Sequence, residues 1–401
     1  MAGVGVSGQG VPVEARGRMP RDELALSVIF AATGVGMALP GAVLPALMHE
    51  WALRDGGAGL LFFLAWLGSS TGALAAGRWR RSVVAGGCAA VAAALAAIAL
   101  GIAELRFVEM FVYGLGLGAA MTAISMIQAE RHARESAWEM NRLNMIWALG
   151  AVACPLLAEH SLRVASAGAI AGALATVFAL LTAWALRGAL NEARGGAQNE
   201  ARRQTVWPPS AKLPRWTALW PVPLMLLAFL PTGIESTMGG WVTEYARREH
   251  QSIRTAVLAA SLFWGGLLVS RGLGATRFLA WRTEPRLLAQ SAWTILVGVL
   301  MLVLLPDRAG ILCGNALVGL GLGPVYPLAL ALALRRREHP GIFWIAGLGS
   351  ALLPWMTGVA SLAGNSLRVG MAVPMAAAAV LVACSLAVGR GVGFSTELGT
   401  E

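Results

Sequence analysis

Long apolar runs separated by short polar breaks dominate the chain. A helix needs about 20 apolar residues to cross the ~30 Å hydrocarbon core of a bilayer, and twelve runs reach this length. They cover residues 24–48, 56–76, 82–102, 107–128, 138–157, 165–186, 219–242, 256–276, 287–305, 310–334, 341–362 and 369–388. The runs are apolar on every side, and lipid offers no partner for bare backbone amides, so we expect helices rather than barrel strands. The pattern predicts an all-α membrane protein with twelve transmembrane helices.

Three motifs occur twice, once in each half of the chain. The copies are Trp66/Gly68 and Trp264/Gly266, the string Gly-Leu-Gly-Leu-Gly at Gly114–Gly118 and Gly319–Gly323, and Leu149-Gly150…Pro155 and Leu348-Gly349…Pro354. Their offsets are 198, 205 and 199 residues, which indicates two copies of one six-helix unit. An even number of helices leaves both ends of a unit on one side, so we expect two parallel repeats. Because the glycines lie in mid-helix, they predict close helix packing rather than a dinucleotide loop.

The repeat divides the chain into two bundles joined by a basic linker. We expect the N-terminal bundle over residues 21–186 and the C-terminal bundle over 218–389. Residues 187–217 carry six basic groups without an apolar period, which predicts a cytoplasmic linker. Residues 1–20 and 390–401 are expected to be cytoplasmic tails, the first of them mobile.

The distribution of charge supports this topology. The chain is 57% hydrophobic and 13% charged, with a formal net charge of +10. With a cytoplasmic N-terminus, 21 Lys and Arg residues outside the helices fall on the cytoplasmic side and eight on the other. This bias is typical of an integral protein of a plasma membrane, here a bacterial inner membrane, with both termini cytoplasmic. We therefore interpret the net charge as topology and expect no nucleic-acid partner.

The polar residues give no sign of catalysis. All five histidines are expected in loops, and the four cysteines lie in apolar runs without metal-ligand spacing. An enzyme would need a nucleophile with a base, or a set of metal ligands. We expect no enzymatic activity, catalytic residue, bound metal or cofactor.

Four stretches of the second half resemble the fucose-permease-like branch of the major facilitator superfamily, the fucose-galactose-glucose cation symporters. They are Gly233-Ile234-Glu235 with Gly240-Trp241…Tyr245, Phe263-Trp264-Gly265 with Arg271-Gly272, Gly323-Pro324-Val325-Tyr326-Pro327, and Gly347-Leu348-Gly349…Leu353-Pro354. The resemblance spans residues 24–388 and implies the major facilitator fold and secondary transport. In the first half, Asn141 and Asn144 match an Asn-x-x-Gln pair that lines the sugar cavity in that branch.

The chain departs from that branch at its acids. The relatives carry a carboxylate shortly after the first Gly-Leu-Gly, where this chain has Met121, and residues 24–48 contain no acid. Proton coupling of that type is therefore not expected. Glu235 is the one carboxylate well inside the C-terminal half, and such an acid faces a wet cavity or pairs with a cation. Two interpretations of Glu235 stay open: a site for substrate or for coupling H⁺ or Na⁺, and a structural acid bonded to a neighbouring helix.

Three aromatic residues and three charged ones complete the candidate site. Trp241, Trp264 and Tyr326 can stack on the apolar face of a sugar and donate a hydrogen bond, although core packing is an equal alternative. Arg271 and Arg142 lie toward the cytoplasmic ends of their helices. They are expected either to snorkel to the interface or to form a gate with Glu139.

These observations favour a secondary transporter that moves a small neutral polar solute by alternating access, with Glu235 as the candidate for cation coupling. A sugar is the favoured substrate, because no Arg or Lys lies at mid-depth to bind an anion. An efflux transporter of amphipathic compounds, an uncoupled facilitator and a solute sensor remain alternatives. The expected partners are the substrate and the lipid bilayer, and we expect a monomer.

Overall fold

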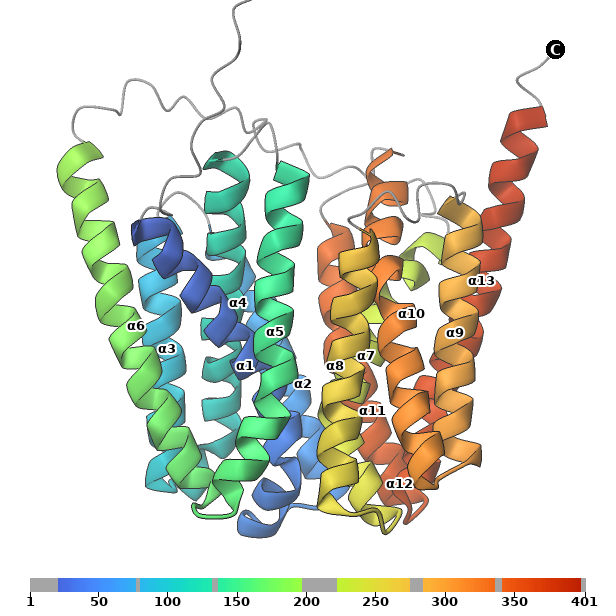
Figure 1. The fold of residues 1–401 in the computed structure, drawn as a ribbon, viewed down its shortest axis with the longest axis horizontal. Helices are drawn as coiled ribbons and strands as arrows, with labels where there is room; N and C mark the ends of the chain where they lie inside the picture. Colours follow the sequence, from blue (N-terminus) through green and yellow to red (C-terminus); the bar gives the residue numbers. More distant parts are fainter. Residues whose placement is uncertain are drawn as a thin grey trace, which may run out of the picture.

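The structure, a computed structural model, describes residues 21–76, 80–131, 136–196, 222–274, 284–335 and 341–397. They form twelve long helices and two short ones (Figure 1). The first half comprises α1 (Arg21–Glu50), α2 (Asp55–Ala73), α3 (Arg80–Leu100), η1 (Ala103–Leu105), α4 (Arg106–Arg131), α5 (Ser136–Leu162) and α6 (Ala167–Gly196). The second half comprises α7 (Val222–Arg248), α8 (Ile253–Gly274), α9 (Glu284–Leu304), α10 (Arg308–Arg335), α11 (Gly341–Ala363), α12 (Leu367–Gly370) and α13 (Ala372–Glu397). The predicted tail 1–20, residues 197–217 of the predicted linker and residues 398–401 lie outside the described residues.

The two halves repeat one packing pattern. In the first half α2 and α3 pack on α4, α3 packs on α6, and α1 packs on α5. In the second half α8 and α9 pack on α10, α9 packs on α13, and α7 packs on α11. These are the same pairs in the same order, which confirms the prediction of two parallel six-helix repeats.

Backbone detail repeats as well, in the turns that follow α1 and α7. Ala52 and His250, which are 198 positions apart, both have positive φ angles, of 49° and 58°. The next residues close the turns in the same way, with Leu53 N donating to Met48 O at 2.9 Å and Gln251 N to Ala246 O at 3.0 Å. This hydrogen bond across a left-handed residue is a Schellman-type helix end. The offset read from the sequence therefore aligns equivalent positions of the two halves.

The doubled glycine string allows close approach between helices, as predicted. Gly114 of α4 lies against the carbonyl of Ala65 in α2, and Gly319 of α10 lies against the carbonyl of Phe263 in α8. In both places a β-carbon would overlap the neighbouring backbone, so only glycine permits this helix separation. The carbonyls belong to the residues directly before Trp66 and Trp264, so the glycines fix the position of each tryptophan-bearing helix.

Gly319→Val is accordingly expected to destabilise the second half by roughly 1–3 kcal/mol or more, because the carbonyl of Phe263 cannot yield as a flexible side chain would. The measurement is the thermal midpoint of unfolding in detergent. Gly265→Val, on α8, is the matched control, since no atom lies within 4 Å of the position that its β-carbon would take. Equal midpoints for the two variants would contradict the packing role.

Ten of the described helices are long and apolar enough to cross a membrane, and α2 and α7 are the long helices that fall short of the criterion. Both lie between the halves: α2 packs on α11, and α7 packs on α1. A helix that faces protein rather than lipid can carry more polar residues, such as Ser236 and Thr237, which are buried in α7.

The halves meet along three helix pairs, α2 with α11, α5 with α8, and α1 with α7. Helix α1 begins and α13 ends at one side of the bundle, here named the termini face, and residues 51–54, 249–252 and 364–366 connect helices at the opposite, far face (Figure 1). Helices α1 and α7 cross where Gly41 meets Gly239, another pair of equivalent positions 198 apart. No side chain fits at this crossing, because a β-carbon on Gly41 would overlap the Gly239 carbonyl.

Candidate functional site

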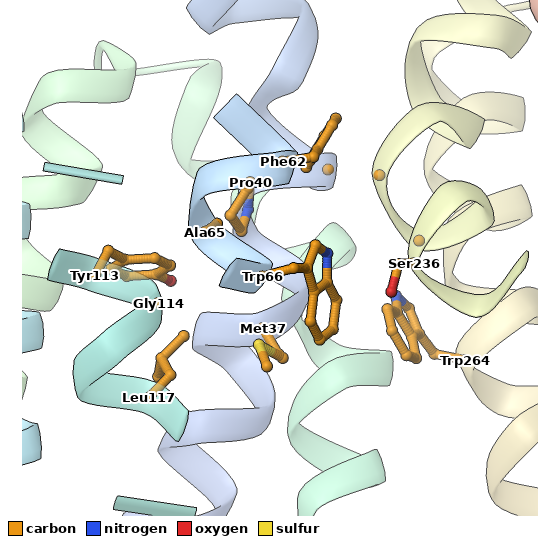
Figure 2. Close-up of a pocket in the computed structure, with 13 residues that line it drawn as sticks. Met37, Pro40, Phe62, Ala65, Trp66, Tyr113, Gly114, Leu117, Ser236 and Trp264 are labelled. Carbon is orange, nitrogen blue, oxygen red and sulfur yellow. The ribbon is translucent and has the colours of Figure 1, made fainter. Parts of the chain in front are cut away.

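A cavity lies between the two halves, lined by residues from the middle parts of five helices (Figure 2). About 430 Å³ of space between these residues is free of protein atoms, and part of this space is open to solvent. The first half contributes Met37, Pro40 and Gly41 from α1, Phe62, Ala65 and Trp66 from α2, and Tyr113, Gly114 and Leu117 from α4. The second half contributes Ser236, Gly239 and Gly240 from α7 and Trp264 from α8. None of these residues is charged.

Few polar groups face this cavity. The Tyr113 hydroxyl donates to the carbonyl of Gly36 at 2.5 Å, and the Ser236 hydroxyl donates to the carbonyl of Thr232 at 2.9 Å. Both protons are thus used by the backbone, and the two oxygens retain lone pairs that can accept from a ligand. The Trp264 indole N–H is buried and has no acceptor among the described residues. The Trp66 indole N–H also donates to none of the described residues, so the two indoles offer a ligand two free donors and the two hydroxyl oxygens offer acceptors.

Glu235 lies next to Ser236 in α7 but is not among the cavity-lining residues. Its Oε2 is 3.4 Å from Nη2 of Arg271 in α8, and each of the two side chains is 17% exposed. The Arg271 guanidinium also lies 6.0 Å from the ring centre of Trp147 in α5, within range of a cation–π contact with the other half. Glu235, Arg271 and Trp147 thus form a chain of contacts between the halves. The ion pair with Arg271 is the bond to a neighbouring helix that a structural role of Glu235 requires. A role of Glu235 in binding substrate or a coupling cation stays open beside it.

The predicted substrate-binding residues occupy different places. Trp264 lines the cavity, whereas Trp241 is fully buried, donates from Nε1 to the Pro354 carbonyl at 3.0 Å, and meets Phe62 of the first half edge to face at 5.8 Å. Asn144 is partly buried in α5. Asn141 and Tyr326 lie on helices, but their side chains lie outside the described residues. Roles in substrate binding stay predictions for all of them.

The predicted gate residues are also separated. Arg142 pairs with Glu23 of α1 at 2.7 Å, within the first half. Arg271 pairs with Glu235, as described above. The side chain of Glu139 lies outside the described residues, so the expected pairing with it stays a prediction. Asp22 of α1 forms ion pairs with Arg81 and Arg131 near the termini face, and these pairs also lie within the first half.

Sequence reasoning missed an ion pair that joins the halves at the far face. Asp55, the first residue of α2, accepts two hydrogen bonds from Arg248 of α7, at 2.5 and 2.8 Å, and one from the Ser361 hydroxyl of α11, at 2.5 Å. Glu244 binds Arg248 from the preceding turn of α7 at 2.7 Å. We name Asp55, Arg248 and Ser361 the far-face latch. Asp55 is only 7% exposed, whereas the Arg248 side chain is 30% exposed, so the carboxylate of the latch is shielded from water and the guanidinium is partly open to it.

Phe62, Trp66 and Tyr113 also escaped the prediction of site residues. They look like ordinary apolar positions, and the one signal that could have selected any of them was the Trp-x-Gly repeat, which makes Trp66 the equivalent of Trp264. Among the described residues no group of three or more His, Cys, Asp or Glu side chains is placed to hold a metal ion.

Comparison with known proteins identifies the family and the fold of the chain. A sequence profile of the Major Facilitator Superfamily matches residues 24–342. The crystal structure of the nucleoside transporter NupG aligns with a TM-score of 0.66 at 11% identity, covering 92% of this chain and 98% of that one. A point mutant of NupG aligns with a TM-score of 0.68 at 12% identity, covering 91% and 99%. At these identities the likeness shows the fold alone. No curated protein sequence matches the chain.

Proposed function

Because the chain belongs to the Major Facilitator Superfamily, we propose that it carries a small neutral solute across the membrane by alternating access. In this mechanism the solute binds between the halves, which then rock about it to expose the site to either side. The observation that carries the proposal is a cavity lined by both halves and lying beside their contacts. A rigid-body motion of one half against the other would change access to it.

The ion pairs at the two faces indicate which side is closed; the Arg271–Trp147 contact also joins the halves, but it is a cation–π contact at 6.0 Å and not an ion pair. The far-face latch joins α2 to α7 and α11, and the ion pairs of Asp22 and Glu23 near the termini face stay within the first half. If the termini face is cytoplasmic, as the Arg distribution predicts, the protein is closed to the outside of a bacterial inner membrane. The site would then load or release solute on the cytoplasmic side.

The cavity supports a neutral solute over an ion. Its lining has no charge to balance an anion or a cation, and transferring an unpaired ion there would be costly. A sugar fits the aromatic rings, which can stack on its C–H faces. A nucleoside is the second candidate, because four aromatic residues line a cavity with few polar groups and the similar NupG structures are those of a nucleoside transporter. Coupling of transport to a cation through Glu235 is part of the proposal.

A reversible crosslink across the far face tests alternating access. The β-carbon position of Gly56 in α2 lies 3.3 Å from Cδ2 of Leu362 in α11. In protein lacking the four native cysteines, the pair Gly56→Cys and Leu362→Cys should form a disulfide on oxidation. Uptake into proteoliposomes, measured with labelled hexoses, nucleosides and amphipathic dyes, should stop on oxidation and return on reduction.

The reduced protein and each single cysteine variant are the controls for that experiment. Uptake that continues at the reduced rate after complete crosslinking would overturn alternating access at this face. The panel also separates the alternatives: export of dyes alone would support the amphipathic efflux transporter, and uptake without response to pH or Na⁺ would support the uncoupled facilitator.

A further inference from the structure

Trp66 and Trp264 occupy equivalent positions of the two repeats and face the same cavity from opposite halves. They are 198 positions apart, and each stands directly after a residue whose carbonyl lies against the first glycine of a glycine string, Gly114 or Gly319. In Figure 2 the Trp66 ring extends toward the cavity from α2 and the Trp264 ring faces it from α8. The doubled motif thus places two indole rings on two sides of one space.

The surroundings hold the Trp264 ring in place. Phe263 and Trp147 contact it edge to face at 4.8 and 5.6 Å, and its Cζ2 lies where a β-carbon on Gly239 would approach to 2.7 Å. Gly239 therefore leaves room that a side chain would fill. Trp264 is 2% exposed, and its N–H has no acceptor among the described residues. A buried donor without a partner is costly, and a ligand acceptor would satisfy it.

The number of polar groups distinguishes between ligand classes. A hexose carries a hydroxyl on most of its ring carbons, and each loses its water on entering a buried site. This cavity offers the indole N–H groups of Trp66 and Trp264 and the two acceptor oxygens of Tyr113 and Ser236, fewer polar groups than a hexose carries. A flat heteroaromatic ring has two apolar faces for the indoles and a few polar atoms on its edge, which suits this lining better.

We propose that Trp66 and Trp264 form a two-sided clamp that stacks on opposite faces of a neutral heteroaromatic ring. The Trp264 N–H lies in the plane of its own ring, so it donates to a polar group that is attached to the ligand ring and stands out of the plane of that ring. The clamp rests on the proposed function and narrows it, since it selects nucleobase-like rings over sugars without one. Because each half supplies one ring, a bound solute also bridges the halves.

Equilibrium binding of labelled uridine, with adenosine and glucose as competitors, tests the clamp on purified protein. The wild type should bind uridine, and adenosine should compete better than glucose. Trp66→Ala and Trp264→Ala should each weaken uridine binding roughly 10- to 100-fold, the usual loss when an aromatic partner of a base is removed. Trp66→Phe should retain most of the affinity, and Trp264→Phe should keep stacking but lose the N–H, with a smaller loss.

Trp293→Ala is the matched control, because Trp293 is half-exposed on α9 and is not a lining residue. Trp264→Phe keeps the site testable if Trp264→Ala does not fold, as judged by its unfolding midpoint. The clamp is overturned if glucose competes better than adenosine, if uridine binding survives both alanine substitutions, or if uridine does not bind. Sugar uptake with unchanged rates in both alanine variants would overturn the clamp and leave the proposed function standing. Absence of uptake for the whole solute panel would count against both.

Discussion

Asp55→Asn is expected to open the far face of the transporter. The carboxylate of Asp55 is the acceptor for Arg248 and Ser361, so the substitution removes the charge that holds α2 of one half to α7 and α11 of the other. Arg248 retains Glu244, which limits the cost of leaving it without Asp55. A charge-assisted hydrogen bond contributes about 1.5–3 kcal/mol. A change of about 2 kcal/mol would shift the ratio of closed to open far face roughly 30-fold.

Distances between spin labels would measure this shift. Arg54→Cys and Arg254→Cys place labels on exposed positions at the far face, one in each half, in protein without the native cysteines. Asp55→Asn should increase the population with long distances, and Ser361→Ala should do so to a smaller extent. Glu249→Gln is the matched control, because Glu249 pairs with Arg368 at 2.7 Å on the same face but within the second half. An equal shift in Glu249→Gln, or none in Asp55→Asn, would contradict the latch.

Glu235→Gln is expected to abolish the accumulation of solute against its concentration gradient and to leave the transport of solute down its gradient intact. If Glu235 binds the coupling cation, the neutral amide cannot release or take up that charge, and transport loses its response to pH or Na⁺. The structural interpretation predicts a different result. Arg271 would lose its partner, and the free energy of unfolding would fall together with both uphill and downhill transport.

Paired measurements of accumulation, exchange and unfolding midpoint separate these outcomes. Glu109→Gln is the control, because Glu109 is a buried acid of α4 whose Oε1 has no partner among the described residues, and it takes no part in the proposed coupling. Unchanged accumulation in Glu235→Gln, with the wild-type response to pH and Na⁺, would remove Glu235 from the mechanism.

The fold could be predicted because two signals are local in sequence. Apolar runs of membrane length define helices, and the repeated glycines identify both the duplication and the helix pairs that approach closely. The ends of the helices were harder to predict. The last apolar run, predicted over 369–388, begins inside a short helix, α12, and continues in α13 from Ala372 to Glu397. Hydropathy does not register such a break, because the residues on both sides of it are apolar.

The site could be predicted only in part, for a reason specific to membranes. Phe62, Tyr113 and Leu117 line the cavity, but a ring that faces a cavity looks the same in sequence as one that faces lipid. The far-face latch presents another difficulty. Asp55 and Arg248 are 193 residues apart, and their contact depends on how the two six-helix bundles dock. The sequence repeat relates to this docking at one point, because Gly41 and Gly239 occupy equivalent positions in the two halves and meet where α1 crosses α7.

If the halves rock as proposed, the close crossing at Gly41 and Gly239 would act as an off-centre pivot. Along α7, Arg248 lies nine residues beyond Gly239, about 14 Å at 1.5 Å per residue, whereas Val222 lies 17 residues, about 26 Å, away on the other side. A tilt of about 10° about this point would move Arg248 by about 2 Å, enough to break hydrogen bonds of 2.5–2.8 Å. The same tilt would displace the other end of the helix by about twice as much. In this motion the short arm would carry the far-face latch, and the end of α7 at the termini face would open more widely.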